Sequence, residues 1–235
     1  SVNEVLYYFH GGGGSEKDWI SDKNYSTIVR ADWAKQTNYP TVVSISFGPM
    51  WFLLPKNKRP QSGLYDQFLS EVMPHVESRL LPAPPTKRQL LGESMGGTNA
   101  ALLALKNPKI FPRVSLVCPG LDISTAGLKE NQAKMIRRVR AMYFPSEKEA
   151  IANSPVGLIA QATKESLAGQ SYFVSCGQQD DYGFFAGSQK FVNLATERNI
   201  YIEWYPVPGR HCSLDIGALS SFLLNEPLQT KEPDA

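Results

Sequence analysis

The sequence predicts an α/β fold in which a mostly parallel sheet of about six strands is covered by helices on both faces. Two observations predict it. Short apolar runs alternate along the chain with longer segments in which apolar residues recur every three or four positions. Most of the short runs are continuously apolar, as expected of strands that are buried on both faces. We therefore expect three layers, with the sheet between two layers of helices.

Six runs have the length and composition of strands, and five segments have helical spacing. The expected strands span residues 5–9, 41–47, 88–91, 114–118, 172–176 and 201–206. The expected helices span residues 25–35, 64–81, 96–106, 184–198 and 213–224. The alternation of strand and helix is thus nearly complete, as it is where helices connect parallel strands.

The chain of 235 residues fits one α/β domain over 1–235. The segment 121–169 departs from the alternation, because it is long, helix-prone and not paired with a strand. Such an insertion can cover a site as a helical cap or lid, and an ordinary surface excursion is an equal alternative.

Charge and composition exclude some classes of partner. The 24 Lys and Arg residues nearly balance the 22 Asp and Glu residues, so the net charge of +2 does not favour binding to nucleic acid or to an anionic membrane. No stretch approaches the roughly 18 apolar residues of a membrane span, so we expect a soluble protein. A cleaved leader leaves no trace, so cytoplasmic and secreted or periplasmic locations stay open. The oligomeric state is not indicated.

The three cysteines, Cys118, Cys176 and Cys212, are an odd number without metal-like pairing, so neither a disulfide framework nor a zinc site is predicted. We interpret Cys118 and Cys176 as small buried hydrophobic residues, because each ends an apolar run. One bridge that uses Cys212 stays open. Neither metal-ligand clusters nor a phosphate-binding loop occurs, so we expect no metal and no cofactor.

A serine lies in the turn between the expected strand 88–91 and the expected helix 96–106. The segment reads Gly92-Glu93-Ser94-Met95-Gly96, which is the G-x-S-x-G pattern of a nucleophile elbow. Glycines are needed at both ends because the turn is strained and crowded. The helix that follows directs amide donors toward the reaction centre. A glycine-rich turn is the alternative, but the strand-to-helix context favours Ser94 as a nucleophile.

The first expected strand ends in His10 and four glycines, Gly11 to Gly14. Loops of this HGGG type supply backbone amides to an oxyanion hole, which is the group of donors that binds the negative charge of a tetrahedral intermediate. We predict Gly12 and Met95 as the donors, with Gly11 or Gly13 as alternatives to Gly12. A flexible linker is a weaker interpretation, because linkers seldom follow a buried strand directly.

A serine nucleophile needs a base, and the chain has only three histidines. His10 belongs to the glycine loop, and His75 lies within an expected helix. His211 follows the last expected strand, as the chain order Ser, Asp or Glu, His requires. We therefore predict His211 as the base.

The acid that orients the histidine should follow an earlier strand. Asp180 and Asp181 come directly after the expected strand 172–176, and Asp122 follows the strand before it. We predict Asp180, with Asp181 as the next choice and Asp122 as a third. An unused aspartate would be a hydrogen-bonding turn residue.

The apolar loop 48–55 follows the second expected strand and should emerge at the same edge of the sheet as Ser94. Trp51 and Phe52 in this loop are candidates for an acyl or aromatic pocket, and a position in the buried core is an equal alternative. Nothing in the sequence identifies the acyl group or the alcohol.

Together these residues resemble the esterase D family, which includes S-formylglutathione hydrolases, feruloyl and acetylxylan esterases and mycolyltransferases. Residues 90–97, Leu-Leu-Gly-Glu-Ser-Met-Gly-Gly, are similar to that family's nucleophile motif, and Asp180 stands three residues after Gly177, where the family's acid usually falls. The further similar positions are 73–77, Ala100, Ala101, Pro108, Phe111 and the Pro-Gly-Arg-His ending at 208–211.

The resemblance implies the three-layer α/β-hydrolase fold and a serine carboxylic ester hydrolase that acts through an acyl-enzyme on a small-molecule or saccharide-linked ester. An acyltransferase or a serine peptidase on the same fold is the alternative. A non-catalytic binding module is less favoured, because the serine, histidine and aspartate are all present.

The chain departs from the family pattern in two places. The family usually has one or two strands before its HG loop, whereas here the loop begins at His10, so we expect either a trimmed fold or an upstream piece absent from this chain. The family also tends to carry an aromatic residue soon after the histidine, whereas this chain has Cys212-Ser213-Leu214. We therefore expect a different substrate shape near the base.

Overall fold

The computed structural model describes residues 3–224, which contain one sheet of six parallel strands in the order β2-β1-β3-β4-β5-β6. The strands are β1 (Glu4–Phe9), β2 (Thr41–Ile45), β3 (Lys87–Glu93), β4 (Arg113–Val117), β5 (Ser171–Gly177) and β6 (Tyr201–Val207). The predicted α/β class and the predicted six strands are confirmed, with ends that differ from the expected ones by at most two residues.

The strand order reverses direction between β1 and β3. From β1 the chain passes to β2 at one edge of the sheet, and it then returns to place β3 on the other side of β1. The last residue of β1, Phe9, pairs with Gly92 near the end of β3. In sheets of this kind the crevice at such a reversal, outside the carboxyl ends of the strands, is the usual ligand site. The glycine loop after β1 and the serine turn after β3 are therefore neighbours.

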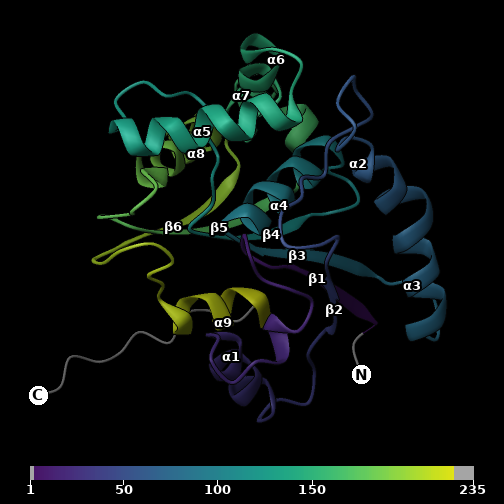
Figure 1. Ribbon diagram of the computed structural model, residues 1–235. Helices are drawn as coiled ribbons and strands as arrows, with labels where there is room; N and C mark the ends of the chain where they lie inside the picture. The colour runs from purple at the N-terminus through teal and green to yellow at the C-terminus, as the bar shows by residue number, and fades with distance from the viewer. Residues whose placement is uncertain (1–2, 225–235) are drawn as a thin grey trace, which may run out of the picture.

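Helices cover both faces of the sheet (Figure 1). One face carries the short turn η1 (Asp18–Ile20) with α1 (Ser26–Trp33) and α9 (Ile216–Leu224). The other carries α2 (Leu64–Gln67), η2 (Phe68–Val72), α3 (Met73–Leu80), α4 (Met95–Lys106) and α8 (Phe184–Glu197). The alternating residues of β1 explain why its sequence is continuously apolar, because Val5, Tyr7 and Phe9 pack in one core and Leu6 and Tyr8 in the other.

Two expected helices differ in detail from the structure. The helix expected over 64–81 contains a π-helical turn, η2, just before Pro74, which has no N–H to donate to the carbonyl of Ser70. The helix expected over 213–224 begins only at Ile216, because Asp215 accepts a hydrogen bond from the N–H of Ala218 at 2.9 Å and so caps it there.

The segment between β4 and β5 is helical, as its composition predicts. It forms α5 (Glu130–Tyr143), α6 (Glu147–Ala152), α7 (Pro155–Gln161) and the short turn η3 (Glu165–Leu167). Ser146 and Ser154 start α6 and α7 by accepting hydrogen bonds from amides in the first turn of each helix. Helix α7 packs against α4 and α8, and α5 contacts α6. Across residues 3–224, no helix has both the length and the apolarity needed to cross a membrane.

Candidate active site

Ser94 occupies a strained turn between β3 and α4. Its φ of 51° and ψ of −113° are unusual for a residue with a side chain. The chain can turn so sharply because the flanking residues lack a Cβ: one added at Gly92 would lie 2.1 Å from the carbonyl oxygen of Gly96, and one at Gly96 would lie 2.0 Å from that of Phe9. The elbow predicted from five residues is thus present, and it exposes the serine hydroxyl at the carboxyl end of the sheet.

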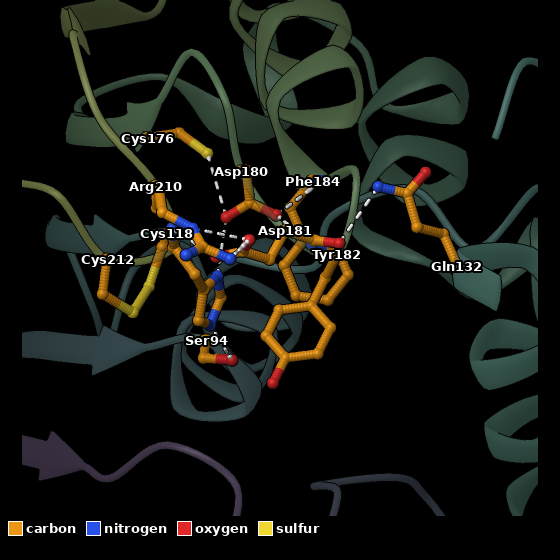
Figure 2. Close-up of polar contacts among 11 residues, drawn as sticks. Ser94, Cys118, Gln132, Cys176, Asp180, Asp181, Tyr182, Phe184, Arg210 and Cys212 are labelled. Atoms are coloured by element: carbon orange, nitrogen blue, oxygen red, sulfur yellow. Dashed lines mark hydrogen bonds and ion pairs between the residues drawn. A yellow bond between two sulfur atoms is a disulfide. The ribbon is translucent and has the colours of Figure 1, made fainter. Parts of the chain in front are cut away.

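Ser94, His211 and Asp180 form a continuous chain of hydrogen bonds (Figure 2). Ser94 Oγ lies 3.0 Å from His211 Nε2, and His211 Nδ1 lies 2.6 Å from Asp180 Oδ2. The three residues follow β3, β6 and β5, so the sheet brings positions that are far apart in sequence to one edge. The structure therefore brings the three predicted residues into contact at this edge.

The Asp180 carboxylate is fully buried, so each oxygen needs a partner. Oδ2 faces His211, and Oδ1 accepts hydrogen bonds from the backbone N–H of Tyr182 at 2.9 Å and of Phe184 at 3.1 Å. These two amides fix the carboxylate plane and leave Oδ2 free to hold the imidazole. These backbone donors keep the acid in place, and the Cys176 thiol adds a longer contact to Oδ2 at 4.0 Å.

The alternative acids, Asp181 and Asp122, are occupied elsewhere. Asp181 is paired with Arg210 at 2.9 Å, and this hydrogen bond holds the pKa of the Asp181 carboxyl below its usual value. Asp122 forms an ion pair with Lys190 at 3.0 Å and accepts a hydrogen bond from a backbone amide. Both are turn residues with partners of their own, and Asp180 is the aspartate that contacts the imidazole.

Two aromatic rings that sequence reasoning missed enclose His211. The ring of Tyr182 stands edge-on to the imidazole with centroids 4.5 Å apart, and that of Phe184 lies at 5.7 Å. The side chain of His211 is consequently only 19% exposed. The sequence does contain a signal for these two rings. Tyr182-Gly183-Phe184 directly follows Asp181 and so continues the loop that carries Asp180.

The glycine loop after β1 presents one free amide to the site. The N–H groups of Gly11, Gly13 and Gly14 donate to Glu93 Oε1 at 3.3 Å, to a carbonyl of the 48–50 loop at 2.7 Å, and to the Gly11 carbonyl at 3.0 Å. Within residues 3–224, the Gly12 N–H has no acceptor, and neither has the N–H of Met95 at the start of α4. Both residues border the cavity beside Ser94. This distribution favours Gly12 over the alternatives Gly11 and Gly13.

His10 anchors this loop rather than joining the reaction centre. Its imidazole is buried, and Nδ1 lies 2.7 Å from the carbonyl of Gly11, to which it must donate. Nε2 then accepts a hydrogen bond from Trp51 Nε1 at 3.2 Å. Of the two alternatives predicted for Trp51, the structure shows the buried one, with the residue 2% exposed and packed against Phe9 and Phe47. Trp51 is absent from the wall of the cavity beside Ser94, whereas its neighbour Phe52 borders it.

A cavity of about 340 Å³ opens at Ser94 and extends toward the helices of the β4–β5 segment. Residues of that segment supply much of its wall, which sequence reasoning missed because only packing decides which face of α5 turns inward. The wall residues of this segment are Gly120, Asp122, Ile123, Met135, Ile136, Val139, Phe144, Asn153, Ser154 and Pro155.

Comparison of this chain with known protein families shows the family to which it belongs. A family model described as "Putative esterase" matches residues 4–218. The chain belongs to this esterase family. It is a carboxylic ester hydrolase with the α/β-hydrolase fold, and the predicted resemblance is confirmed.

Solved structures share the fold of the esterase. A ferulic acid esterase superposes with a TM-score of 0.68 at 18% identity, over 96% of this chain and 83% of its own. An S-formylglutathione hydrolase from Agrobacterium tumefaciens gives a TM-score of 0.69 at 17% identity, over 96% and 82% of the two chains. The fluorophosphonate-binding serine hydrolase F of Staphylococcus aureus gives 0.63 at 17% identity, over 94% and 82%.

The esterase also contains a half-buried carboxyl group, that of Glu93, beside the glycine loop. Glu93 accepts the hydrogen bond from the Gly11 amide and borders the cavity. Removal from water raises the pKa of the Glu93 carboxyl, and the Gly11 amide opposes this by stabilising the charged form. Glu93 thereby supports the loop that carries the free Gly12 amide.

A disulfide joins Cys118, at the end of β4, to Cys212, directly after His211 (Figure 2). Cys118 is therefore not a simple buried hydrophobic residue, and the bridge that the sequence left open for Cys212 is present. The loop that holds His211 crosses the end of β5, where a Cβ on Gly177 would lie 2.1 Å from the carbonyl oxygen of Arg210, and so reaches β4. Cys176 is a free buried thiol whose pKa burial raises to about 12.

One group of side chains in the described part of the esterase has the spacing of a metal site. The ligand atoms of Cys118, His211 and Cys212 lie within 4.8 Å of one another. The two sulfurs are bonded to each other, so they do not offer the thiolates that a zinc ion would need.

We expect the Cys118→Ala, Cys212→Ala double variant to lose about 3 kcal/mol of unfolding free energy, because a bridge across a long loop restricts the unfolded chain. The bridge spans 94 positions. Urea unfolding of both proteins, with and without dithiothreitol, measures this. The reductant should bring the wild type to the stability of the variant and leave the variant unchanged. Equal stability of the two proteins without reductant would contradict the expectation.

Proposed function

We propose that the esterase cleaves its ester through an acyl-enzyme on Ser94, with His211 as general base and acid and with Asp180 orienting His211. The observation that carries this proposal is the unbroken chain of hydrogen bonds from Ser94 through His211 to Asp180 at the mouth of the cavity. A serine hydroxyl alone is a weak nucleophile, and this arrangement supplies the base that it needs.

In the first half of the reaction, Ser94 Oγ attacks the carbonyl carbon of the ester and its proton passes to His211 Nε2. The carbonyl oxygen becomes an oxyanion, which the free amides of Gly12 and Met95 stabilise. Collapse of this intermediate breaks the bond to the alcohol oxygen, which takes the proton from Nε2. The alcohol leaves, and the acyl group stays on Ser94.

In the second half, water attacks the acyl carbon and gives a proton to His211 Nε2. The second oxyanion uses the same two amides. Its collapse returns the proton to Ser94 Oγ and releases the carboxylic acid. Asp180 keeps the Nδ1 proton of the imidazole directed toward itself at 2.6 Å, so that the Nε2 lone pair faces the serine in each half.

The β4–β5 segment acts in this proposal as a helical cap on a single domain. Its helix α7 packs against α4 and α8, and its residues, including those of α5, border the cavity that begins at Ser94. Covering the reacting bond in this way excludes bulk water and strengthens the electrostatic contribution of the amides.

A fluorophosphonate probe tests the proposal, because such reagents form a stable adduct only with an activated serine. A serine hydrolase of the same fold is itself described as fluorophosphonate-binding. We expect one adduct per chain, located on Ser94 by peptide mass spectrometry, and at least a hundredfold slower labelling of His211→Ala. Labelling of another serine, or equally fast labelling of His211→Ala, would contradict the assignment.

A further inference from the structure

The cavity beside Ser94 is apolar beyond the reacting groups. Its far wall is built by side chains from three elements, namely α4, the 48–54 loop and the β4–β5 segment. Helix α5 contributes residues at positions 135, 136 and 139, which share one face of the helix. The apolar wall residues are Met50, Phe52, Leu102, Ile123, Met135, Ile136, Val139, Phe144 and Pro155.

The polar side chains in the same wall already have protein partners. Thr98 donates to a backbone carbonyl at 2.9 Å, and Asp122 is held by Lys190. Ser154 caps α7, and the Asn153 amide donates to a carbonyl of α6 at 2.9 Å. A polar group deep in this cavity would thus lose its hydrogen bonds to water with few new ones in return. The cavity therefore favours a hydrocarbon group.

The size of the cavity excludes a close fit to a very small acyl group. A volume of about 340 Å³ has room for about ten non-hydrogen atoms, at roughly 30 Å³ for each water-sized group. A formyl or acetyl group would fill only the part next to Ser94. Each further methylene that enters the apolar part should raise kcat/KM by about fourfold until the cavity is full.

The position of His211 decides which half of the ester enters this cavity. His211 Nε2 must deliver its proton to the leaving oxygen, so the alcohol lies on the histidine side of the reacting carbon. On that side lies a second, more open hollow of about 600 Å³, and most of the residues that line it carry polar groups. Its wall residues are Asn131, Gln132, Met135, Asp181, Tyr182, Arg210 and His211. The alcohol therefore faces polar side chains, and the acyl group takes the apolar cavity.

We propose that the cavity under α5 is an acyl site for linear, saturated chains of about six to ten carbons, joined to a polar alcohol. This inference rests on the proposed function, because it uses the proton transfer from His211 to assign the two sides. Val139, in the inward face of α5, limits the length of the chain that enters.

A series of para-nitrophenyl esters with acyl chains of two, four, eight and sixteen carbons tests the acyl site at a constant leaving group. We expect kcat/KM to be at least tenfold higher for the octanoate than for the acetate and lower again for the sixteen-carbon ester. The Val139→Phe variant should lower the octanoate-to-acetate ratio at least tenfold, because the larger ring fills the cavity. The Val139→Ala variant should move the optimum to longer chains.

Arg138→Phe is the matched control, because it adds the same ring one residue away on the exposed side of α5. It should keep the wild-type ratio. A rate that falls steadily from acetate onward, with turnover still dependent on Ser94, would overturn the acyl assignment and leave the proposed function intact. An unchanged ratio in both Val139 variants would also overturn it. Turnover that is independent of Ser94 for every ester would instead overturn the proposed function.

Discussion

The Ser94→Ala variant is expected to hydrolyse para-nitrophenyl octanoate with a kcat about 10⁵-fold to 10⁶-fold below that of the wild type, the scale seen when a triad serine is removed. The physical reason is that the acyl-enzyme can form only on this oxygen, which lies 3.0 Å from the base. The oxyanion amides remain in the variant and should preserve a small rate above that in water. Steady-state kinetics with a purified, folded variant measures the effect.

Ser213→Ala provides a matched control, since it removes a hydroxyl two residues from His211 in the same loop. It should keep kcat within a factor of about three, as most substitutions away from reacting groups do. Circular dichroism of both variants separates loss of chemistry from loss of fold. A Ser94→Ala protein that is folded and retains more than a hundredth of the wild-type rate would refute the role of Ser94.

Asp180→Asn is expected to lower kcat about 10⁴-fold while the protein keeps its fold, because an amide cannot select the required imidazole tautomer. The remaining oxygen can still accept the hydrogen bonds of the Tyr182 and Phe184 amides, so the loop should stay in place. The amide nitrogen would face Nδ1 as a donor, and the imidazole would then turn its own N–H toward Ser94. Kinetics at constant pH with the octanoate ester measures the loss.

Asp181→Asn separates this effect from a general loss of negative charge in the same loop. Asp181 pairs with the exposed Arg210 and does not contact the imidazole side chain. Its replacement should lower kcat less than tenfold, since exposed ion pairs contribute little. Losses of equal size in the two variants would show that Asp180 acts only through charge or loop structure.

Much of the framework could be predicted because it depends on local patterns. The strands and helices could be predicted because the spacing of apolar residues indicates which faces each element buries. Ser94 was found from the glycines that its turn requires, and His211 from elimination among three histidines and from chain order. Asp180 and Asp181 are both candidates by position after a strand, the resemblance to the esterase D family favours Asp180, and the structure places Asp180 against His211. These residues could be found because they follow the ends of neighbouring strands.

Other features depend on contacts that no local pattern records. The bond between Cys118 and Cys212 requires the loop after β6 to cross the end of β5, and this crossing depends on Gly177. Trp51 is buried because its ring nitrogen bonds His10, a contact between loops 41 positions apart in sequence.

The sequence by itself determined the fold class, the nucleophile elbow and the order of serine, acid and histidine, because each is written in spacing along the chain. Only the tertiary structure decided that Gly12 has the free amide, since that follows from which neighbouring amides find acceptors. It also decided that α5 places Val139 in the wall of the cavity beside Ser94. Packing between distant segments decides both the free Gly12 amide and the position of Val139. The same packing sets the shape of the acyl cavity.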